Sequence, residues 1–387
     1  MKRILYIWKD KYPWDIRVEK FCKSFIDNGY EVLLLCRWKG EVQEEEIVDG
    51  ISVKRVGFGK SALLTQPLSL NPVWRNSIKA IINEFKPGLI ITREFFLTEA
   101  AKKYALPMKI PVIFDMAEHY PAAMKGWDKY SKNIIKRFFV HSIKLPEKLE
   151  KKAINSSDGI IVVSKELKER LLNEFTYPKE QIVEVLNTPS ISEYSSITNH
   201  ILSKPMRFAY HGHFSNDRNL DVLAKAFVNA LKINNEISLF MAGTGESFEQ
   251  VKDIVESANA TKSIILYGAY KQQEMVRFLS ETDVGILPYK DNTFINHIIS
   301  NKLFDYMASG IPVIVSQARP MRRIINDTKS GLVVDCNDVD ILTDAILKIA
   351  GMDSTELSKN ALKAAEVYNW ENDSKKLISF IERFIDD

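Results

Sequence analysis

Short apolar runs alternate with helical patterns through the first half of the chain. Between the first two runs, Val18, Phe21, Cys22 and Phe25 recur at helical spacing, and Gly29 follows where a helix end favours glycine. Apolar runs without polar alternation are typical of parallel strands buried on both faces. The expected strands are residues 3–8, 31–36, 89–92, 112–115, 159–163 and 182–185. This order of elements predicts a doubly wound α/β domain.

A second strand–helix series begins after a stretch rich in Ser, Thr, Asn and Pro. Its expected strands are residues 207–211, 237–242, 263–267, 284–287 and 312–316, with helices at 220–231 and 248–258. We therefore predict an N-terminal domain over 1–190, a connection over 191–205, a C-terminal domain over 206–368, and a last helix within 369–387 that packs back on the N-terminal domain. Parallel sheets bind ligands beyond the carboxyl ends of their strands, so a cleft between two facing Rossmann-like domains is expected to hold the chemistry.

Length and composition agree with this picture. The 387 residues fit two domains, and 45% hydrophobic with 27% charged residues is typical of a globular protein. No apolar run reaches the ~18 residues of a membrane span, and the run from Ile4 to Trp8 is too short for a signal peptide. The three scattered cysteines favour a reducing compartment, so a cytoplasmic location is expected. A net charge of +3 gives no reason to expect nucleic-acid binding.

Charge is concentrated in one segment, residues 122–153. Apolar residues from Trp127 to Ile143 recur there at helical spacing, until Pro146 interrupts or restarts the helix. One interpretation is a solvated helix with its apolar face on the core. The other is that residues 125–152 contact the anionic inner face of the cell membrane or a lipid-linked substrate. The segment holds nine basic residues, Lys125, Lys129, Lys132, Lys136, Arg137, Lys144, Lys148, Lys151 and Lys152, against Asp128, Glu147 and Glu150.

Two loops of the second domain have the residue types that hold phosphates. Gly243 and Gly245 follow a strand and precede a helix, which allows close backbone approach to an anion, although such a pair is often only a turn. Ser300 is suited to cap the helix that follows. The first N–H groups of this helix and the Lys302 ammonium can both attract the same bound anion. The alternative is a capped helix with a surface lysine. Together the loops predict a diphosphate site.

The sequence SNKLFDYMASGIPVI at residues 300–314 resembles the donor-site helix of the retaining glycosyltransferase family 4, which has the GT-B fold and belongs to the glycogen synthase and sucrose synthase-like group. Further segments agree with that family in order and spacing. They are residues 211–212, 218–220, 241–245, 267–270 and 283–288, and upstream 13–19, 115–121 and 186–188. The resemblance covers nearly the whole chain and is strongest from Phe208 to Val334.

The resemblance implies transfer of a sugar from a nucleoside-diphosphate sugar, held by the second domain, to an acceptor held by the first, with retained anomeric configuration. It implies no cofactor and no required metal. Negative charge develops on the departing diphosphate, so cations must face it, and Arg218 stands where the family has a basic residue. The expected donor-binding residues are Gly212, Arg218, Gly243, Gly245, Tyr270, His297, Ser300, Asn301, Lys302, Leu303 and Asp305.

The chain departs from the family pattern at three positions. Asp305 stands where a glutamate binds the ribose, and it can still accept hydroxyl hydrogen bonds. His297 stands where a second glutamate touches the donor sugar, so it is either a sugar ligand or a loop histidine. Ala117 occupies the position of a histidine that closes on the sugar.

Acceptor activation is expected from the loop after the strand 112–115. Glu118 or His119 would orient the acceptor hydroxyl, with its proton passing to the departing phosphate, so Glu118, His119 and Arg218 are the expected catalytic residues. The alternative is that Asp115 caps this loop while His119 and Tyr120 pack it. The expected acceptor-binding residues are Asp15, Arg17, Arg93, Glu94 and Glu118.

The leading hypothesis is a glycosyltransferase acting on a glycan or lipid-linked acceptor in surface polysaccharide or glycolipid biosynthesis, peripheral to the membrane. One alternative is a sugar-nucleotide epimerase or hydrolase on the same scaffold. Another is a non-catalytic partner subunit, motivated by the three departures. His211 and His213 alternate as zinc ligands sometimes do, but no third ligand stands at a telling spacing, so no metal site is predicted.

Overall fold

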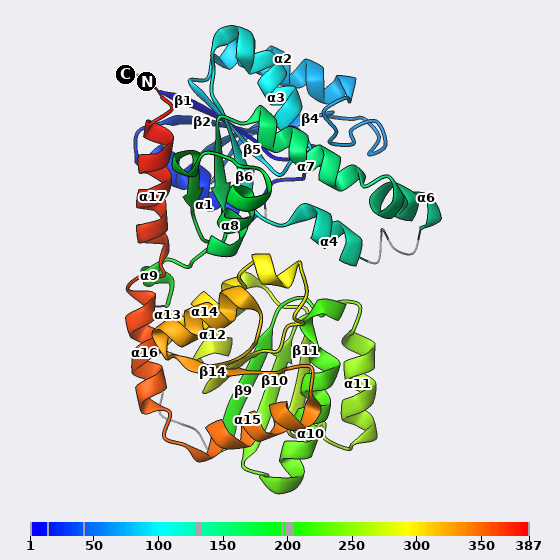
Figure 1. The fold of residues 1–387 in the computed structure, drawn as a ribbon, viewed down its shortest axis with the longest axis vertical. Helices are drawn as coiled ribbons and strands as arrows, with labels where there is room; N and C mark the ends of the chain where they lie inside the picture. Colours follow the sequence, from blue (N-terminus) through cyan, green and yellow to red (C-terminus); the bar gives the residue numbers. More distant parts are fainter. Residues whose placement is uncertain are drawn as a thin grey trace. The chain divides into compact units, whose positions relative to one another are not determined.

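The computed structural model describes residues 2–13, 15–41, 43–127, 130, 133–194, 197 and 205–385. The chain divides into two compact domains (Figure 1). The N-terminal domain consists of Met1–Asn187 together with Asp373–Asp387, and the C-terminal domain is Thr188–Asn372. The chain thus leaves the N-terminal domain once and returns to it at its end.

The N-terminal domain is built on an eight-stranded sheet in the order β3-β4-β2-β1-β5-β6-β7-β8. Neighbouring strands pair in parallel, except β3 with β4, which is an antiparallel hairpin at one edge. Strand order reverses at β1, which lies between β2 and β5, and such a switch point is where open sheets bind ligands. The strands are β1 (Arg3–Ile7), β2 (Glu31–Arg37), β3 (Glu45–Val48), β4 (Ile51–Val56), β5 (Leu89–Arg93), β6 (Val112–Met116), β7 (Gly159–Val162) and β8 (Ile182–Glu184).

Six of these strands match the sequence prediction, whereas β3 and β4 were missed. Strand β3 is an edge strand with two glutamates, and its Ile47 is 74% exposed. Strand β4 lies between β3 and β2 and carries Lys54 and Arg55, so neither strand is a continuous apolar run. The helices of the domain are α1 (Ile16–Asp27), α2 (Pro72–Phe85), α3 (Thr98–Ala105), α4 (Tyr120–Gly126), α6 (Ile134–Arg137), α7 (Leu145–Ser156) and α8 (Lys165–Glu174), with short turns η1 (Leu106–Met108) and η3 (Lys179–Gln181).

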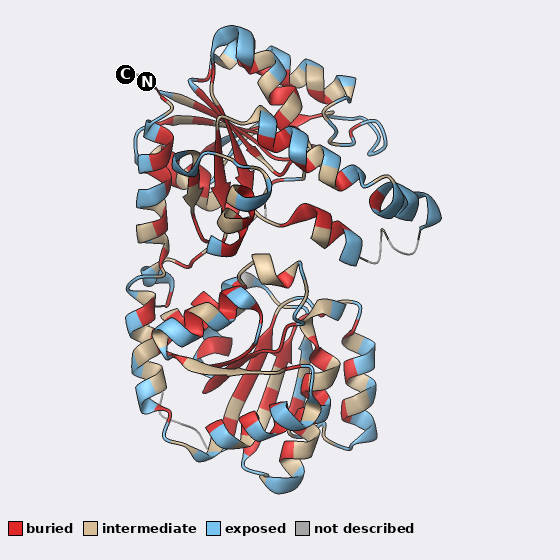
Figure 2. Cartoon of the chain, in the orientation of Figure 1, coloured by how far each residue is buried: buried red, intermediate tan, exposed pale blue. Residues whose placement is uncertain are grey.

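The sheet is buried between helices, with its strands largely inaccessible (Figure 2). Trp74 and Ile78 of α2 pack with Leu5 of β1 in one core cluster. A second cluster joins β6 and β7 to α4, α7 and α8. The last helix, α17 (Trp370–Glu382), brings Phe380 against this domain, where a Cβ on Gly159 would lie 3.1 Å from the Phe380 ring.

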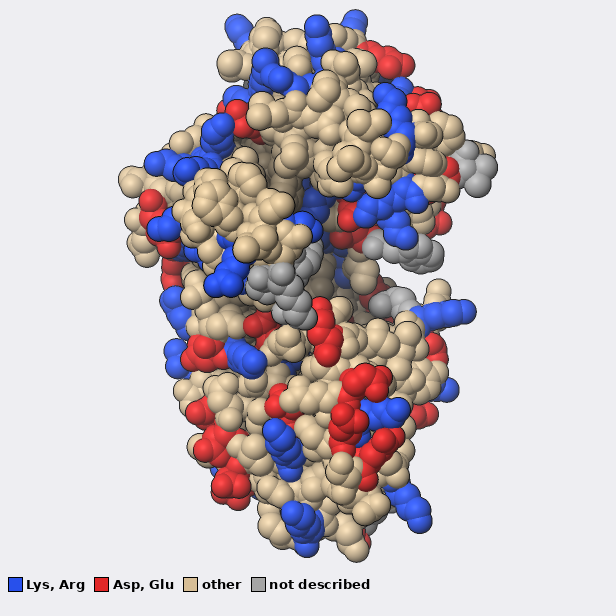
Figure 3. Space-filling view, turned by 90° about the vertical axis from the view of Figure 1, so that its right-hand side faces the viewer, with Lys and Arg blue, Asp and Glu red and all other residues tan. Residues whose placement is uncertain are grey.

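The basic segment is not one helix. It consists of α4, α6, a π-helical turn η2 (Phe138–Ser142) and α7, and Pro146 lies in the first turn of α7, so it restarts a helix. Asp128, Lys129 and Lys132 lie outside the described residues, as does Trp14. Figure 3 views the side on which α6 lies, and shows Lys and Arg side chains among uncharged surface there. Among the described residues, no helix is both long and apolar enough to span a bilayer.

The C-terminal domain has a six-stranded parallel sheet in the order β11-β10-β9-β12-β13-β14. The strands are β9 (Met206–His211), β10 (Ile237–Ala242), β11 (Ile264–Gly268), β12 (Val284–Leu287), β13 (Val313–Ser316) and β14 (Gly331–Val334). All but β14 were predicted. Strand β14 was missed because it is a half-buried edge strand of only four residues.

Helices cover both faces of this sheet (Figure 1). They are α10 (Leu220–Ile233), α11 (Phe248–Ser257), α12 (Met275–Ser280), α13 (Asn301–Ala308), α14 (Arg319–Thr328), α15 (Val339–Gly351) and α16 (Thr355–Ala365), with short turns η5 (Asn216–Arg218), η6 (Gln272–Glu274) and η7 (Ile295–His297). The predicted connection 191–205 begins with a short helix, α9 (Ile191–Tyr194), and residues 195–196 and 198–204 lie outside the described part.

Candidate functional site

The C-terminal sheet reverses its strand order between β9 and β12, which pair with each other. Ligands of open α/β sheets bind beyond the carboxyl ends of the strands at such a switch point. The loop after β9 holds Gly212 and leads to Arg218, and the loop after β12 begins with Tyr289 and leads to α13. Most of the predicted donor-binding residues therefore lie on elements that meet at one edge.

The predicted glycines are required by close contact between loops. A Cβ on Gly243 would lie 1.8 Å from the Gly212 carbonyl oxygen, and one on Gly245 would lie 2.6 Å from the Phe214 carbonyl oxygen. The Phe214 N–H donates to the Thr244 carbonyl at 2.9 Å and joins the same loops. Glycine at these positions thus permits the loops after β9 and β10 to touch.

Lys302 reaches from the first turn of α13 over Gly212. A Cβ on Gly212 would stand 2.2 Å from Lys302 Cε and 2.5 Å from Nζ, and Gly212 has a φ of +118° that favours glycine. The absence of a side chain at Gly212 therefore makes room for the lysine. The ammonium group is held at the carboxyl end of β9.

Ser300 occupies the N-cap position of α13, as predicted, but its hydroxyl does not cap the helix. The backbone is extended there, with φ −71° and ψ 124°, and Ser300 Oγ lies 2.9 Å from the Tyr289 hydroxyl. Leu303 is fully buried, and its backbone N–H is engaged with the Ser300 carbonyl, to which it donates at 3.1 Å. With no side-chain cap, the helix end presents N–H groups suited to an anion.

Arg218 adds a second cation at this helix end. Its guanidinium lies over the Tyr289 ring, 4.0 Å from the centroid, and its buried Nη1 has no hydrogen-bond partner among the residues that the structure describes. Burial by itself raises the pKa of Tyr289, but Lys302, Arg218 and the Ser300 hydrogen bond lower it below its ordinary value. The lowered pKa reflects positive potential around this buried phenol.

His211 is a further buried group here that the sequence prediction did not place in the donor site. It is 6% exposed, its Nδ1 lies 3.4 Å from the Tyr270 hydroxyl, and its Nε2 has no partner in the described part of the chain. Burial, together with the Lys302 charge, holds the pKa of His211 well below its usual value, so the ring is neutral at neutral pH. Its position at the end of a buried strand, just before Gly212, was the available signal.

Asp305 is joined by a tyrosine from α9. Tyr194 is buried and donates its hydroxyl to Asp305 Oδ1 at 3.1 Å, and its pKa is raised by burial and by the carboxylate. Burial, and the neighbouring Asp305 and Tyr289, raise the pKa of Tyr270 to about 12. The sequence prediction missed Tyr194 because it belongs to a stretch assigned to the interdomain connection.

Two predicted donor residues lie at the margin of this cluster. Asn301 is exposed in the first turn of α13. His297 closes the turn η7, and its Nδ1 lies 2.7 Å from the Thr293 carbonyl oxygen, as a loop histidine would. A role for His297 toward the donor sugar stays a prediction.

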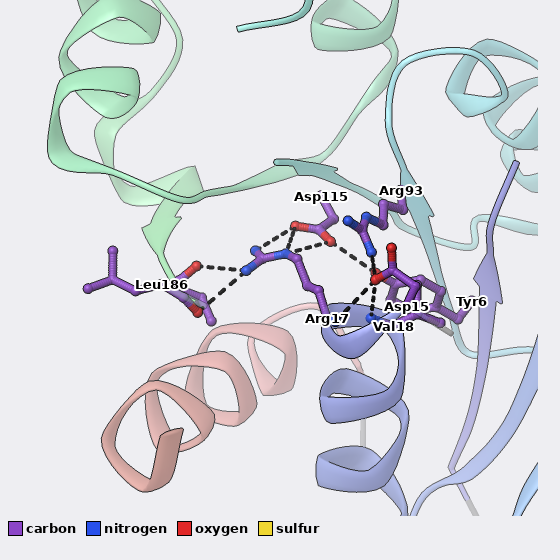
Figure 4. Close-up of polar contacts among 8 residues, drawn as sticks. Tyr6, Asp15, Arg17, Val18, Arg93, Asp115 and Leu186 are labelled. Atoms are coloured by element: carbon purple, nitrogen blue, oxygen red, sulfur yellow. Dashed lines mark hydrogen bonds and ion pairs between the residues drawn. The ribbon is translucent and has the colours of Figure 1, made fainter. Parts of the chain in front are cut away.

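In the N-terminal domain, Arg17 forms a buried network in place of the predicted acceptor contact (Figure 4). It is 2% exposed, and its Nη2 and Nε donate to Asp115 at 2.7 and 3.0 Å. Its Nη1 donates to the Val185 carbonyl at 3.1 Å, and the Tyr6 hydroxyl donates to Asp115 at 2.9 Å. Arg17 therefore binds elements of the domain together.

Asp15 and Arg93 form an ion pair beside this network (Figure 4). Asp15 also caps α1 by accepting from the N–H groups of Arg17 and Val18 at 3.1 and 3.0 Å. The Arg93 guanidinium lies 4.5 Å from the centre of the Trp8 ring. Burial lowers the pKa of Arg93, but the Asp15 carboxylate and other nearby groups raise it above its ordinary value. Both residues organise the switch point at β1 and β5.

Glu94 and the loop after β6 lie beyond the carboxyl ends of β5 and β6. Glu94 is 8% exposed, pairs with Lys9, and has a left-handed φ of +66°, while burial raises its pKa. His119 is the N-cap of α4, and its Nδ1 accepts from the Ala122 N–H at 3.4 Å. Packing by His119 and Tyr120 matches the alternative interpretation, but Asp115 binds Arg17 and does not cap the loop. Glu118 is half-buried.

No metal site was predicted from His211 and His213. His213 is exposed and lies 3.7 Å from Glu246, and no cluster of three potential ligands occurs among the described residues. Cys22, Cys36 and Cys336 are free and buried, and burial raises the pKa of each thiol. These cysteines have the character of core residues.

Both domains match models of known families. Residues 16–188 match the model "Glycosyltransferase Family 4", and residues 196–367 match "Glycosyl transferases group 1". Among curated proteins, an uncharacterised glycosyltransferase of Methanocaldococcus jannaschii is 21% identical over 57% of this chain and 58% of its own length. The matches to curated relatives span 25% to 58% of those proteins, which is less than two thirds.

Solved structures share the fold along the whole chain. Sucrose-phosphate synthase of Thermosynechococcus elongatus superposes with a TM-score of 0.73 at 16% identity, covering 99% of each chain. HepE of Anabaena, solved in complex with UDP, superposes with a TM-score of 0.71 at 11% identity, covering 99% of this chain and all of the other. At such identities the likeness establishes the arrangement of the backbone in two Rossmann-like domains.

Proposed function

Because the chain belongs to the glycosyltransferases of the GT-B fold, with a family 4 domain and a group 1 domain, we propose that it transfers a sugar from a nucleoside-diphosphate sugar to a glycan or lipid-linked acceptor, with retained configuration. We place the donor in the C-terminal domain and the acceptor in the N-terminal domain. The product would belong to surface polysaccharide or glycolipid biosynthesis. No cofactor or metal enters this proposal.

The cationic end of α13 is the observation that carries the proposal. Lys302 over Gly212, Arg218 over Tyr289 and the uncapped N–H groups of α13 converge on one place. As the glycosidic bond to a diphosphate breaks, negative charge grows on the leaving group, and fixed donors lower the barrier because they need no reorganisation. Arg218 has a buried N–H group to offer a phosphate oxygen.

The nucleoside is assigned to the neighbouring residues. Asp305 can accept hydrogen bonds from ribose hydroxyls once Tyr194 yields its place or shares the carboxylate. Tyr270 lies beside His211 at the same strand ends. The UDP complex of HepE supports a nucleoside diphosphate as the ligand class.

Glu118 is the residue that we assign to the acceptor hydroxyl. It is half-buried in the loop after β6, one of the segments in which the chain resembles the family. The acceptor proton would pass to the departing phosphate.

Thermal shifts with UDP, GDP, ADP, CDP and dTDP test the donor site. A ligand that binds only the folded state stabilises it by about 2.7 kcal/mol at a hundred times its Kd, so we expect one nucleotide to raise the melting temperature of the protein. Arg218→Ala and Lys302→Ala should each weaken the binding of that nucleotide about tenfold or more. Lys252→Ala, on the exposed face of α11, is the matched control and should leave the shift unchanged.

The alternatives have distinct outcomes in the same experiment. A protein that binds none of the five nucleotides at millimolar concentration would contradict the proposal and favour a non-catalytic partner subunit. Release of nucleotide from the donor sugar at the same rate with and without acceptor would favour a hydrolase or epimerase.

We further propose that residues 125–152 contact an anionic membrane. Ile134, Ile135 and Phe138 are 83%, 65% and 55% exposed, so these apolar side chains do not pack against the core. Lys136 and Arg137 stand between them and have no ion-pair partner among the described residues. Apolar side chains flanked by unpaired cations suit a surface of anionic lipid.

Co-sedimentation with vesicles tests this contact. Wild-type protein should bind vesicles of phosphatidylglycerol and phosphatidylcholine in preference to pure phosphatidylcholine, and less so at high salt. Lys136→Glu with Arg137→Glu should abolish most binding, whereas Lys232→Glu, a surface change in the C-terminal domain, should not. Binding that ignores the charge of both protein and lipid would contradict the proposal.

A further inference from the structure

A groove of about 540 Å³ opens in the N-terminal domain between two parts of the chain that are distant in sequence. One wall comes from residues 63–68, in the loop after β4, and the other from α6, η2 and α7. The groove is lined largely by apolar side chains: Leu63, Pro67, Leu68, Phe96, Met124, Tyr130, Phe139, Val140, Leu145, Pro146 and Leu149. It lies within one domain and is separate from the donor cluster.

Both rims of this groove expose large apolar residues. In the loop, Leu63 is 79% exposed and Leu68 is 46% exposed, and Leu70 beyond them is 77% exposed. On the opposite rim, Phe139 is 44% exposed. Removal of exposed apolar side chains from water is favourable, so two apolar rims on one groove indicate an apolar partner.

The charges at the groove are mainly positive. Its charged lining residues are Lys9, Arg37 and Lys136, with Asp10 as the one acid among the described residues. Asp10 is paired with Lys39 at 2.6 Å, Lys9 is paired with Glu94, and Arg37 is buried against the loop. Lys136 is exposed at the rim, where it can meet a phosphate.

Arg37 shapes the loop wall. It is buried, and it donates to Thr65 Oγ1 at 3.2 Å and to the Ala62 carbonyl. These hydrogen bonds tie the loop that carries the exposed leucines to β2.

The inner end of the groove reaches the carboxyl edge of the sheet. Lys9 follows β1, Phe96 follows β5, and Met124 lies on α4, which follows β6. Lys9 pairs with Glu94 and lies 4.9 Å from the centre of the Phe96 ring. The groove thus connects an apolar, basic surface with the edge to which we assigned the acceptor.

We propose that this groove binds the hydrocarbon chain of a phosphate-linked lipid acceptor, with its phosphate at the basic rim and its sugar directed to the carboxyl edge of the sheet. This inference rests on the proposed function and names the substrate class of its acceptor. The exposed apolar residues of 63–70 and 134–139 enter the bilayer surface together, so the hydrocarbon chain passes from the lipid into the groove without crossing water. Desolvation of the chain and its phosphate charge supply the affinity.

Farnesyl phosphate, used below its aggregation concentration, is a direct probe of the groove. We expect calorimetry to show that wild-type protein binds it at least about tenfold more tightly than farnesol or inorganic phosphate. Phe139→Asp should weaken binding about tenfold or more, because it places a carboxylate in the apolar wall. Ile134→Asp is the matched control, since Ile134 is exposed on the same segment but outside the groove lining. It should lower vesicle binding and leave farnesyl phosphate binding intact.

The outcomes separate this inference from the proposed function. If the nucleotide shift is present but farnesyl phosphate does not bind, or binds both variants like wild type, the groove does not hold a lipid chain and the inference fails while the donor site stands. If no nucleotide raises the melting temperature, the proposed function itself is contradicted. Leu68→Asp, on the opposite wall, repeats the test if Phe139→Asp does not fold. Self-association that Phe139→Asp abolishes, without lipid-phosphate binding, would mark the groove as a protein interface and overturn the inference.

Discussion

At the scale of single residues, His211 shows how surroundings decide the chemistry of a side chain. Its ring packs edge-on against Tyr306, with 5.3 Å between centroids, and lies near Tyr270 and Lys302. Removal from water and the lysine charge both oppose protonation, so the pKa of His211 falls well below its usual value. A neutral ring leaves the positive charge of the site to Lys302 and Arg218, which suits a dianionic leaving group.

This lowered pKa predicts a pH dependence of stability. Below about pH 6.5, His211 binds a proton in the unfolded chain but stays neutral in the folded protein. The free energy of unfolding of the C-terminal domain should therefore fall as pH drops, by up to about 1.4 kcal/mol per pH unit. His211→Gln should flatten this slope between pH 5 and 6.5, as followed by thermal unfolding at each pH. His213→Gln, at the exposed position two residues on, should keep the wild-type slope. Equal slopes in wild type and His211→Gln would refute the assignment.

At the scale of elements, one arginine joins three parts of the N-terminal domain. Arg17 lies on α1, its partner Asp115 on β6, and the Tyr6 that shares Asp115 on β1 (Figure 4). The Val185 and Leu186 carbonyls, just after β8, accept from its Nη1. A buried charge is tolerated here because the Asp115 carboxylate and these carbonyls face the guanidinium.

Removal of Arg17 should therefore unfold the domain more readily. Arg17→Met leaves the buried Asp115 carboxylate without its ion-pair partner, and we expect the free energy of unfolding to fall by about 3–5 kcal/mol. Urea unfolding followed by tryptophan fluorescence measures it, since five of the six tryptophans belong to residues 1–187. Lys23→Met on the same helix breaks only the exposed pair with Glu19, and should cost less than about 1 kcal/mol. Similar losses in the two variants would contradict the role of Arg17.

At the scale of the whole molecule, the chain returns to its first domain through α17. This helix begins at Trp370 in the C-terminal domain and continues beyond Asp373 in the N-terminal domain. Phe380 and Phe384 pack together against Gly159 at the start of β7, where a Cβ would lie 2.7 Å from Phe384. The small residue at Gly159 is what admits the two rings.

Phe380→Ala should consequently destabilise only one domain. Truncation of this buried ring should cost the N-terminal domain about 3–5 kcal/mol, measured by tryptophan fluorescence in urea. Nucleotide affinity, measured by calorimetry, should be unchanged because the donor cluster lies in the C-terminal domain. Val367→Ala, at a position 62% exposed, should change neither. A fall in nucleotide affinity with Phe380→Ala would show that the domains are not independent in this respect.

The sequence by itself determined the class of fold and most of its strands. Buried parallel strands such as β7 and β12 are continuous apolar runs, and a local pattern of that kind is legible without any knowledge of what packs on it. The cationic start of α13 was equally recognisable, because Ser300 and Lys302 are neighbours in the chain. Strands β3 and β4 were not, because charged residues interrupt their apolar runs, and β14 is a half-buried edge strand of only four residues.

Only the tertiary structure decided how polar residues are engaged. Arg17 belongs to a segment of the family pattern, yet it is enclosed by groups from β6 and from the chain after β8. Tyr194 reaches Asp305 across 111 positions, and the groove joins walls more than 60 positions apart. Such contacts follow from how elements pack and not from local periodicity, so no pattern along the chain could have revealed them.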